Sequence, residues 1–418
     1  MLGRFAVATT VAITILAHSP ANAEDRRTVV LLLFDGWAPA MVDAFATPTL
    51  DRIRKEGSWS HHLVPVFPSI SLPNQISIST GCYPEHHGIV TNRFRDPDRG
   101  IYDHSHDADW LTGCEHLHQA AERQGVRSAA FGWAGRKSGT RGALASTISD
   151  EKSFKEFPSD SERTDQVIAQ LNLPDDRRPR LILGYFHGPD GAAHFSGMDS
   201  DKTREAVERS DAEVGRVVAA IEKLPWADQV ALIVTTDHGM TPVTSIVNVK
   251  RILYNRGVDA TAISSGTTAF VYLADPSQLD DAVTRLAGYD EFDVVRRDAL
   301  PAEWKIGNSA RVGDFIVSAH PPYFIEDLDT WPTWLRWLGD WGPEFLWARM
   351  SLKATHGYPP SAAPVESILY AWGSGVAKGS EVKTMNAVDV HPTVCSLLGI
   401  TPGSPVDGTV AQGLLQPM

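Results

Sequence analysis

The sequence predicts an α/β fold with a doubly wound, mainly parallel central sheet that has helices on both faces. Segments with the helical spacing of apolar residues alternate with short apolar runs rich in β-branched residues. Such runs are typical of strands buried on both faces, and their alternation with helices is typical of a doubly wound sheet. The five runs cover residues 28–34, 128–133, 181–186, 230–235 and 367–372.

The helices expected between these strands are recognised by their spacing and their ends. Residues 48–56 alternate apolar and charged side chains at helical spacing, and Gly57 ends the segment. The same spacing predicts helices at residues 111–124, 201–224 and 388–398. Ligands of doubly wound sheets bind beyond the carboxyl ends of the strands, so the residues that follow each strand are the first candidates for a site.

Residues 245–319 have a different pattern, with shorter strand-like pieces. We interpret them as a small α+β module inserted in a main catalytic domain that extends over residues 24–418. The pieces are strands at 268–273, 292–296 and 311–318 and one helix near 279–286.

A tryptophan-rich segment follows at residues 327–350. It contains five tryptophans, Trp331, Trp334, Trp337, Trp341 and Trp347. Tryptophan is usually part of a core, yet it is also enriched where a surface meets ligands. An exposed lid over the site and a buried packing segment are both consistent with this composition.

The first 23 residues have the features of a secretion signal. Arg4 precedes an apolar run at residues 6–17 that is too short to span a bilayer, and Ala21-Asn22-Ala23 matches the small-x-small cleavage pattern. An N-terminal membrane anchor is the alternative. No other run approaches the ~20 apolar residues of a transmembrane helix. We therefore expect a periplasmic or secreted protein without a transmembrane anchor.

Charge and cysteine content restrict the possible partners. The formal net charge of −13 argues against a nucleic-acid scaffold, which would have a basic face, and still allows a small anionic substrate beside a bound cation. Export permits disulfides. Of the three cysteines, Cys82 and Cys114 are the expected pair, because Cys395 lies in a late amphipathic helix where a buried thiol is the simpler interpretation.

Three carboxylates and three imidazoles follow predicted strands or lie close behind them. Asp190 and His194 are four residues apart, so a helical turn would place both on one face, close enough to hold one metal ion. Mixed nitrogen and oxygen ligands in two clusters suit zinc better than magnesium or calcium. The six candidate ligands are Asp35, Asp190, His194, Asp237, His238 and His356.

Ser71 adds a hydroxyl group to this set. Pro73 suits the first turn of a helix, so Ser71 is expected near a helix N-terminus, where free backbone amides favour an anion. Ser71 could act as the nucleophile beside the metal ions, or simply as an N-cap. Asn74 could donate its amide to a phosphoryl oxygen, or serve as a turn residue.

The order of these motifs resembles the nucleotide pyrophosphatase/phosphodiesterase family of the alkaline phosphatase superfamily. The similarity extends over nearly the whole chain after the signal and includes Arg311-Val312-Gly313-Asp314 in the module. In order, the motifs are Phe34-Asp35-Gly36, Thr47-Pro48-Thr49-Leu50-Asp51, Phe67-Pro68-Ser69-x-Ser71-x-Pro73-Asn74, Thr80-Gly81-x-Tyr83-Pro84-Glu85-His86-His87-Gly88-Ile89, Pro189-Asp190-x3-His194, Thr236-Asp237-His238-Gly239-Met240 and His356-Gly357.

The resemblance implies two Zn²⁺ ions as cofactors. Asp190, His194 and His356 would hold one ion, and Asp35, Asp237 and His238 would hold the other. Ser71, itself a ligand when deprotonated, occupies the nucleophile position, and Asn74 occupies the phosphoryl-contact position. Two positions depart from the family pattern: serine replaces the usual threonine at residue 71, and Gln75 stands where histidine is frequent.

We therefore expect an exported hydrolase that cleaves phosphate diester or pyrophosphate bonds through a phosphoseryl intermediate. Its substrate would be a small phosphate ester, with a nucleotide or a lipid head group. A phosphomonoesterase on the same site is the alternative, since Arg136, Lys137 and Arg141 would favour monoesters if they reached the substrate. A sulfatase is less consistent with the sequence, because Ser71-Leu72-Pro73-Asn74-Gln75 lacks the Cys of the common sulfatase type and the Arg that follows it. A non-catalytic binding protein is also less consistent, because all six ligands are present.

Overall fold

The structure is a computed structural model. It describes residues 27–103, 110–139, 142–151, 156–325 and 352–417. The expected signal peptide, the tryptophan-rich segment and Arg141 lie outside these residues.

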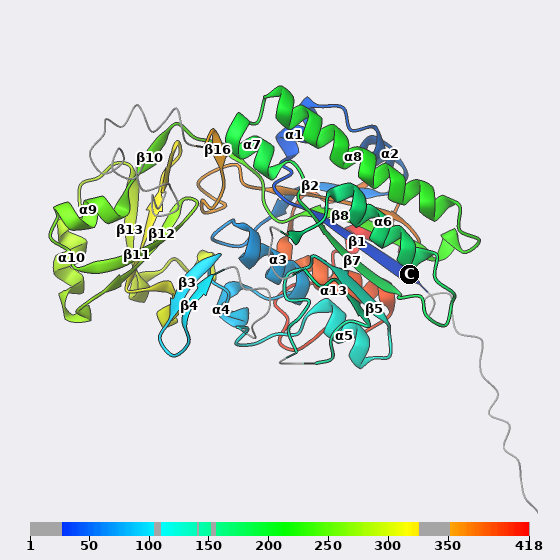
Figure 1. The fold of residues 1–418 in the computed structure, drawn as a ribbon, viewed down its shortest axis with the longest axis horizontal. Helices are drawn as coiled ribbons and strands as arrows, with labels where there is room; N and C mark the ends of the chain where they lie inside the picture. The colour runs from blue at the N-terminus through cyan, green and yellow to red at the C-terminus, as the bar shows by residue number, and fades with distance from the viewer. Residues whose placement is uncertain (1–26, 104–109, 140–141, 152–155, 326–351, 418) are drawn as a thin grey trace, which may run out of the picture.

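A nine-stranded sheet forms the centre of the main body (Figure 1). Its strands lie in the order β18-β2-β17-β8-β1-β7-β5-β6, and β19 pairs with β2 at one end. The bounds are β1 (Thr28–Phe34), β2 (Ser58–Val64), β5 (Ser128–Phe131), β6 (Thr147–Ile148), β7 (Leu181–Phe186), β8 (Val230–Thr236), β17 (Ser367–Gly373), β18 (Ser380–Glu381) and β19 (Met385–Asn386).

The sheet is mixed, with a continuous parallel part. Strands β8, β1, β7, β5 and β6 run parallel, whereas β17 is antiparallel to both β8 and β2. All five predicted strands are present and the α/β fold class is confirmed. Strand β2 was not predicted, because Ser60, His61 and His62 interrupt its apolar pattern.

Helices cover both faces of the sheet, and β1 shows why. Val30, Leu32 and Phe34 face one core, which also contains Val207 and Val214 of α8. Val29, Leu31 and Leu33 alternate with them and face a second core that contains residues of α5 and α13. The helices of the first face are α2 (Pro48–Glu56), α6 (Asp160–Leu171) and α8 (Asp201–Glu222); those of the second are α3 (Ser71–Thr80), α5 (Leu117–Arg123) and α13 (Val390–Leu398).

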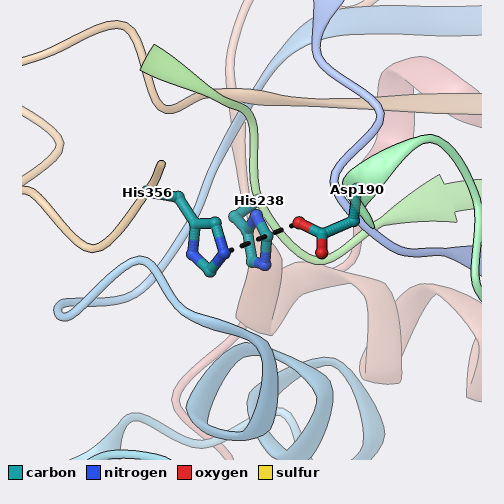
Figure 2. Close-up of side chains that lie close together, drawn as sticks. All are labelled: Asp190, His238 and His356. Atoms are coloured by element: carbon teal, nitrogen blue, oxygen red, sulfur yellow. Dashed lines mark ion pairs between the residues drawn. The ribbon is translucent and has the colours of Figure 1, made fainter. Parts of the chain in front are cut away.

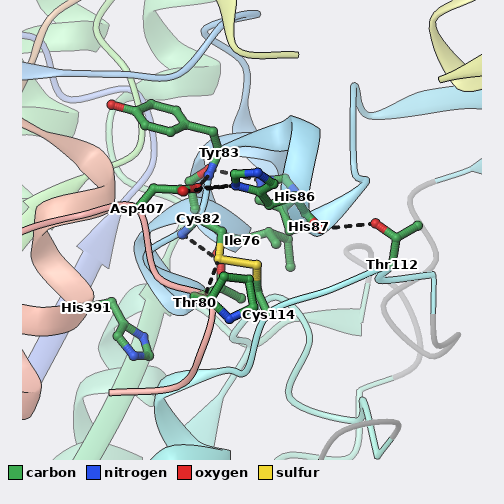
Figure 3. The surroundings of a disulfide bond; sticks show 12 residues. Ile76, Thr80, Cys82, Tyr83, His86, His87, Thr112, Cys114, His391 and Asp407 are labelled. Carbon is green, nitrogen blue, oxygen red and sulfur yellow. Dashed lines mark hydrogen bonds and ion pairs between the residues drawn. A yellow bond between two sulfur atoms is a disulfide. The ribbon is translucent and has the colours of Figure 1, made fainter. Parts of the chain in front are cut away.

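The predicted helix at residues 111–124 begins only at Leu117. Cys114 has a positive φ of 69°, which is incompatible with a right-handed helix, and it forms the predicted disulfide with Cys82 (Figure 3). The bond joins the loop before α5 to the end of α3. Cys395 is a buried free thiol, as expected.

The residues expected to form the inserted module fold as a separate antiparallel sheet beside the main body (Figure 1). Its strand order is β11-β12-β14-β13, and β11 was not predicted. The bounds are β11 (Ala260–Ser265), β12 (Thr268–Leu273), β13 (Phe292–Arg296), β14 (Phe315–Ala319), α9 (Val249–Asn255) and α10 (Leu279–Arg285). The parallel pair β10 (Ser245–Val247) and β15 (Tyr323–Ile325) joins the module to the main body.

The remaining α-helices and strands of the described chain are short. They are α1 (Pro39–Ala44), α4 (Pro84–His87), α7 (Asp190–Ser196), the hairpin β3 (Arg93–Asp96) and β4 (Gly100–Asp103), and the antiparallel pair β9 (Thr241–Pro242) and β16 (Ala354–Thr355). Within the described residues, no helix combines the length and apolarity that crossing a membrane requires.

Candidate metal centre

Three carboxylates lie at the carboxyl ends of three neighbouring strands. Asp35 follows β1, Asp237 follows β8, and Asp190 begins α7 after β7. Because β8, β1 and β7 are adjacent and parallel, their ends meet at one edge of the sheet. His194 lies on α7, and His356 follows the short strand β16.

The first ligand group consists of Asp190, His194 and His356. Asp190 Oδ1 lies 3.2 Å from His194 Nε2 and 3.6 Å from His356 Nε2, and the two imidazole nitrogens are 3.1 Å apart. Figure 2 shows the Asp190 carboxylate directed toward the ring of His356. The structure therefore brings together the three residues that the sequence suggested as one set of ligands.

The second group consists of Asp35, Asp237 and His238. The Nε2 atom of His238 lies 3.3 Å from Asp35 Oδ1 and 3.7 Å from Asp237 Oδ1. The rings of His238 and His356 stack with centroids 3.5 Å apart, so the two groups adjoin. His238 also lies within reach of Asp190 and His356.

The three histidines are held in one tautomer. Their Nδ1 atoms lie 2.8 Å from Ala354 O for His194, 3.0 Å from Ser69 O for His356 and 3.0 Å from Gly239 O for His238. A carbonyl oxygen only accepts hydrogen bonds, so Nδ1 carries the proton in each ring. Each ring therefore directs its Nε2 atom toward the candidate metal position.

The electrostatics of the site also fit bound cations. Asp35 Oδ1 and Asp190 Oδ1 are buried and have no hydrogen-bond partner among the described residues. Burial and the nearby Asp35 carboxylate raise the pKa of Asp237 to about 7. Although burial opposes it, Asp237 and Asp35 raise the pKa of His238 to about 10. The cluster thus holds excess negative charge, and its nitrogen and oxygen donors suit zinc.

A glycine allows the two groups to approach each other. Gly36 has a φ of 64°, and a Cβ atom there would lie 2.7 Å from Asp190 Oδ1. Both the backbone conformation and the space therefore require glycine after Asp35.

Ser71 is the first residue of α3. Its hydroxyl oxygen lies 3.2 Å from His238 Nε2, beside the second ligand group. Ile70 rather than Ser71 occupies the N-cap position, so the Ser71 hydroxyl is not used as a helix cap.

The structure does not bring Asn74 to the site, and the role predicted for it disagrees with its contacts. Asn74 is fully buried. Its Oδ1 accepts a hydrogen bond from the backbone of Val66 at 2.6 Å, and its Nδ2 donates to carbonyl oxygens, the shortest at 2.9 Å to Ile70. The Asn74 amide thus stabilises the loop before α3, which agrees with the alternative interpretation of Asn74 as a turn residue.

Asn92 lies beside Ser71 and was missed. Its Oδ1 accepts a hydrogen bond from Leu72 N at 2.9 Å, which places its side-chain amide at the first turn of α3. A single asparagine after Val90-Thr91 has no local signal, because only the packing of this loop against α3 brings it to the start of that helix.

In the loop that contains Arg136, Lys137 and Arg141, the Arg136 side chain points into the protein interior. This side chain is fully buried and donates to the carbonyl oxygens of Ser149 at 3.2 Å and Trp133 at 3.3 Å. Lys137 Nζ donates to the carbonyl oxygen of Glu151 at 3.2 Å. These contacts are to backbone carbonyls of the segments that follow β5 and β6.

The sheet, the two ligand groups and the serine at one strand edge define an alkaline-phosphatase-like α/β protein. Residues 29–359 match the family described as type I phosphodiesterase / nucleotide pyrophosphatase. The chain belongs to this family, and the resemblance seen in the sequence is confirmed. It is therefore an enzyme of the phosphodiesterase/nucleotide pyrophosphatase class. Members of this family depend on metal ions.

Relatives with known names are similar over almost the whole chain. A bis(5'-adenosyl)-triphosphatase enpp4 from Xenopus laevis is 27% identical over 98% of this chain and 86% of its own length. Ectonucleotide pyrophosphatase/phosphodiesterase family member 7 from Rattus norvegicus is 25% identical over 100% of this chain and 94% of its own.

Solved structures share the fold. Murine ectonucleotide pyrophosphatase/phosphodiesterase 5 superposes with a TM-score of 0.82, at 22% identity, over 93% of this chain and 100% of that one. A second structure of that protein, an inactive variant in complex with AMP, has the same TM-score of 0.82 at 23% identity, with the same coverage of both chains.

Proposed function

We propose that this enzyme is an exported di-zinc hydrolase that cleaves phosphate diester or pyrophosphate bonds through a phosphoserine formed on Ser71. The observation that carries the proposal is the Ser71 hydroxyl, 3.2 Å from His238 Nε2 at the start of α3. The helix start adds free backbone amides on the same side, which favour the negative phosphoryl group.

Two sets of residues would hold the ions. Asp190, His194 and His356 would hold one zinc, and Asp35, Asp237 and His238 the other, with Ser71 as a further ligand of the second. Zinc bound there would lower the pKa of a hydroxyl group and neutralise charge on the phosphoryl oxygens. The Nδ1–carbonyl contacts and the unpartnered carboxylate oxygens among the described residues support this assignment.

The chain's own residues account for the covalent steps. The Ser71 oxygen attacks phosphorus, and the bond from phosphorus to the leaving oxygen breaks. In this first step Ser71 loses its proton and the leaving oxygen gains one. Water then attacks the phosphoserine and loses a proton, the phosphorus–oxygen bond to Ser71 breaks, and the Ser71 oxygen takes up a proton, which regenerates the hydroxyl. We assign to Asn92, in place of Asn74, the donation of an amide hydrogen to a phosphoryl oxygen, because Leu72 holds Asn92 beside Ser71.

The contacts of Arg136 and Lys137 favour a diester or pyrophosphate over a monoester. A monoester dianion needs additional fixed positive charge, and these two side chains bind backbone carbonyls of the segment that follows β6. The names of the relatives and the AMP complex of a neighbour support a small nucleotide-type substrate. The signal-like N-terminus and relatives named as ectoenzymes support a periplasmic or secreted location.

One assay tests the reaction class. Purified protein is given a nitrophenyl phosphodiester and the matching nitrophenyl monoester, with and without a chelator, and its metal content is measured. We expect about two zinc ions per chain, a higher kcat/KM for the diester, and loss of activity with chelator that zinc restores. Full activity with calcium or magnesium as the bound metal would refute the di-zinc assignment, and dominant monoester cleavage would establish the alternative.

A further inference from the structure

Two buried neutral side chains bind the carboxylates of the second ligand group from behind. The Tyr185 hydroxyl donates a hydrogen bond to Asp35 Oδ2 at 2.5 Å. The Gln75 amide donates from Nε2 to Asp237 Oδ2 at 2.9 Å. Both donors are almost inaccessible to solvent, with exposed fractions of 4% for Tyr185 and 5% for Gln75.

In each carboxylate the other oxygen is the one directed toward His238. Asp35 Oδ1 lies 3.3 Å from His238 Nε2 and has no hydrogen-bond partner among the described residues. Asp237 Oδ1 lies 3.7 Å from the same nitrogen and accepts hydrogen bonds from the backbone of Gly36 at 3.3 Å and His238 at 3.1 Å. The side-chain donors and the candidate metal position are therefore on opposite oxygens.

The two donors come from elements that already define the site. Tyr185 lies in β7, where it pairs with Leu33 of β1. Leu33 comes two residues before Asp35 in the chain. Gln75 lies four residues after Ser71 on α3, so the two side chains share one face of that helix. The Gln75 hydrogen bond thus joins the helix that carries the proposed nucleophile to a ligand of the proposed metal ion.

A neutral donor on one carboxylate oxygen has two effects on a metal ligand. It fixes the rotation of the carboxyl group, and it leaves one oxygen rather than two for the ion. Single-oxygen ligation suits small ions of low coordination number such as zinc, whereas calcium is often bound by both oxygens of a carboxylate.

We infer that Tyr185 and Gln75 are positioning residues, which hold Asp35 and Asp237 so that each presents one oxygen to the metal ion bound with His238. This inference rests on the proposed di-zinc function. Gln75 occupies the position where the family pattern frequently has histidine, so its amide would supply here a donor suited to a carboxylate.

The test measures metal affinity directly rather than turnover. The two zinc dissociation constants of the purified holoenzyme are measured by competition with a chromogenic chelator for wild type, Tyr185→Phe and Gln75→Met. Both variants keep the approximate size of the side chain and remove only the donor. We expect a ~10–100-fold loss of affinity for one zinc ion, the scale typical of outer-shell partners, and less than about threefold change for the other.

Matched controls separate positioning from general packing. Tyr370→Phe removes another buried hydroxyl, which contacts His61 Nε2 at 2.6 Å, and Gln119→Leu removes a buried amide that donates to Ser138 O at 2.8 Å. Neither should change either zinc affinity. The thermal midpoint of each variant, measured with excess chelator, reports any loss of stability that does not depend on the metal ions.

The outcomes are distinct. Selective weakening of one zinc ion in both variants supports the inference. Unchanged affinity in either variant, or an equal loss at both ions accompanied by a lower midpoint without metal, overturns it. A wild-type protein that binds no zinc would overturn the proposed function itself, and this inference with it.

Discussion

The Ser71 hydroxyl oxygen and His238 Nε2 are 3.2 Å apart, although 167 residues separate them in the chain. Ser71 begins α3 on one side of the site, and His238 follows β8, near the centre of the sheet. His238 in turn lies between the two ligand groups, because its ring stacks on His356 and its Nε2 faces Asp35. The proposed nucleophile thus lies next to the imidazole at which the two groups adjoin.

Replacing Ser71 by alanine should abolish covalent catalysis while the fold and metal content stay nearly intact. We expect kcat to fall by about 10³-fold or more, the range seen when a nucleophile is removed. Ser71→Thr, which keeps the hydroxyl and matches the family pattern, should retain activity within about tenfold, although its methyl group restricts χ1. Turnover of Ser71→Ala within a few-fold of wild type would exclude the phosphoserine.

The basic loop should have little influence on substrate choice. Lys137→Gln and Arg141→Gln should change the ratio of diester to monoester kcat/KM by less than about threefold, because Lys137 contacts backbone oxygens. Arg136→Met should instead lower the thermal midpoint, because the buried Arg136 guanidinium lies 3.6 Å from Glu151 Oε2 and removing one partner of a buried ion pair costs about 3–5 kcal/mol. Selective collapse of a dominant monoester activity in the Lys137 or Arg141 variant would contradict this interpretation.

Buried histidines near the disulfide should make the fold sensitive to acid. Burial lowers the pKa of His118 and of His391 to about 4, below the usual 6.5. Between pH 6.5 and 4 the unfolded chain binds protons that the folded chain does not, so the free energy of unfolding falls as the pH falls. We expect a loss on the order of 1 kcal/mol per pH unit for each such group.

The measurement is urea unfolding at about pH 7, 6 and 5, a range that spans the unfolded-state titration of histidine, with each variant compared with wild type at the same pH. His118→Leu should flatten the acid dependence, because neither imidazole nitrogen of His118 has a hydrogen-bond partner among the described residues. His320 is a control with the opposite pH dependence. Its hydrogen bond to Asp293 raises its pKa, so His320 stabilises the fold at low pH and this stabilisation disappears at high pH. His320→Gln should therefore not flatten the dependence, and a flat profile in wild type would show the prediction to be wrong.

A buried ion pair should fasten the module to the main body. Arg311 Nε donates to Asp96 Oδ2 at 2.7 Å, and its Nη1 donates to the carbonyl oxygens of Gly88 at 2.6 Å and Trp110 at 2.8 Å. Arg311→Met would leave Asp96 buried and unpaired, so we expect a loss of about 3–5 kcal/mol in the free energy of unfolding.

The matched control is an exposed pair in the module. Arg285 and Asp281 are 2.7 Å apart at the surface of α10, and Arg285→Met should cost no more than about 0.5 kcal/mol. Denaturant unfolding of both variants compares the two pairs. Equal and small effects would show that Arg311 does not anchor the module.

Local sequence determined the elements and the residues with metal-ligand chemistry. The apolar runs at β1 and β7 predicted both strands with their observed bounds, because a strand buried on both faces needs continuous apolar residues. The positions of Asp35 and Asp237 after parallel strands were enough to predict that their carboxylates meet, since neighbouring parallel strands end at one edge. Spacing alone also placed Asp190 and His194 on one helical turn.

Tertiary packing decided which polar groups face the site. Asn74 and Asn92 have the same side-chain amide but different partners. The Asn74 amide donates to carbonyl oxygens of its own loop, whereas Asn92 is held at the start of α3 by the backbone of Leu72. The buried position of Arg136, the orientation of His238 between the two ligand groups, and the antiparallel direction of β17 likewise depend on contacts between distant segments. A residue's type fixes which hydrogen bonds and ligands it can form, whereas the partner it uses depends on what the folded chain brings within about 3 Å of it.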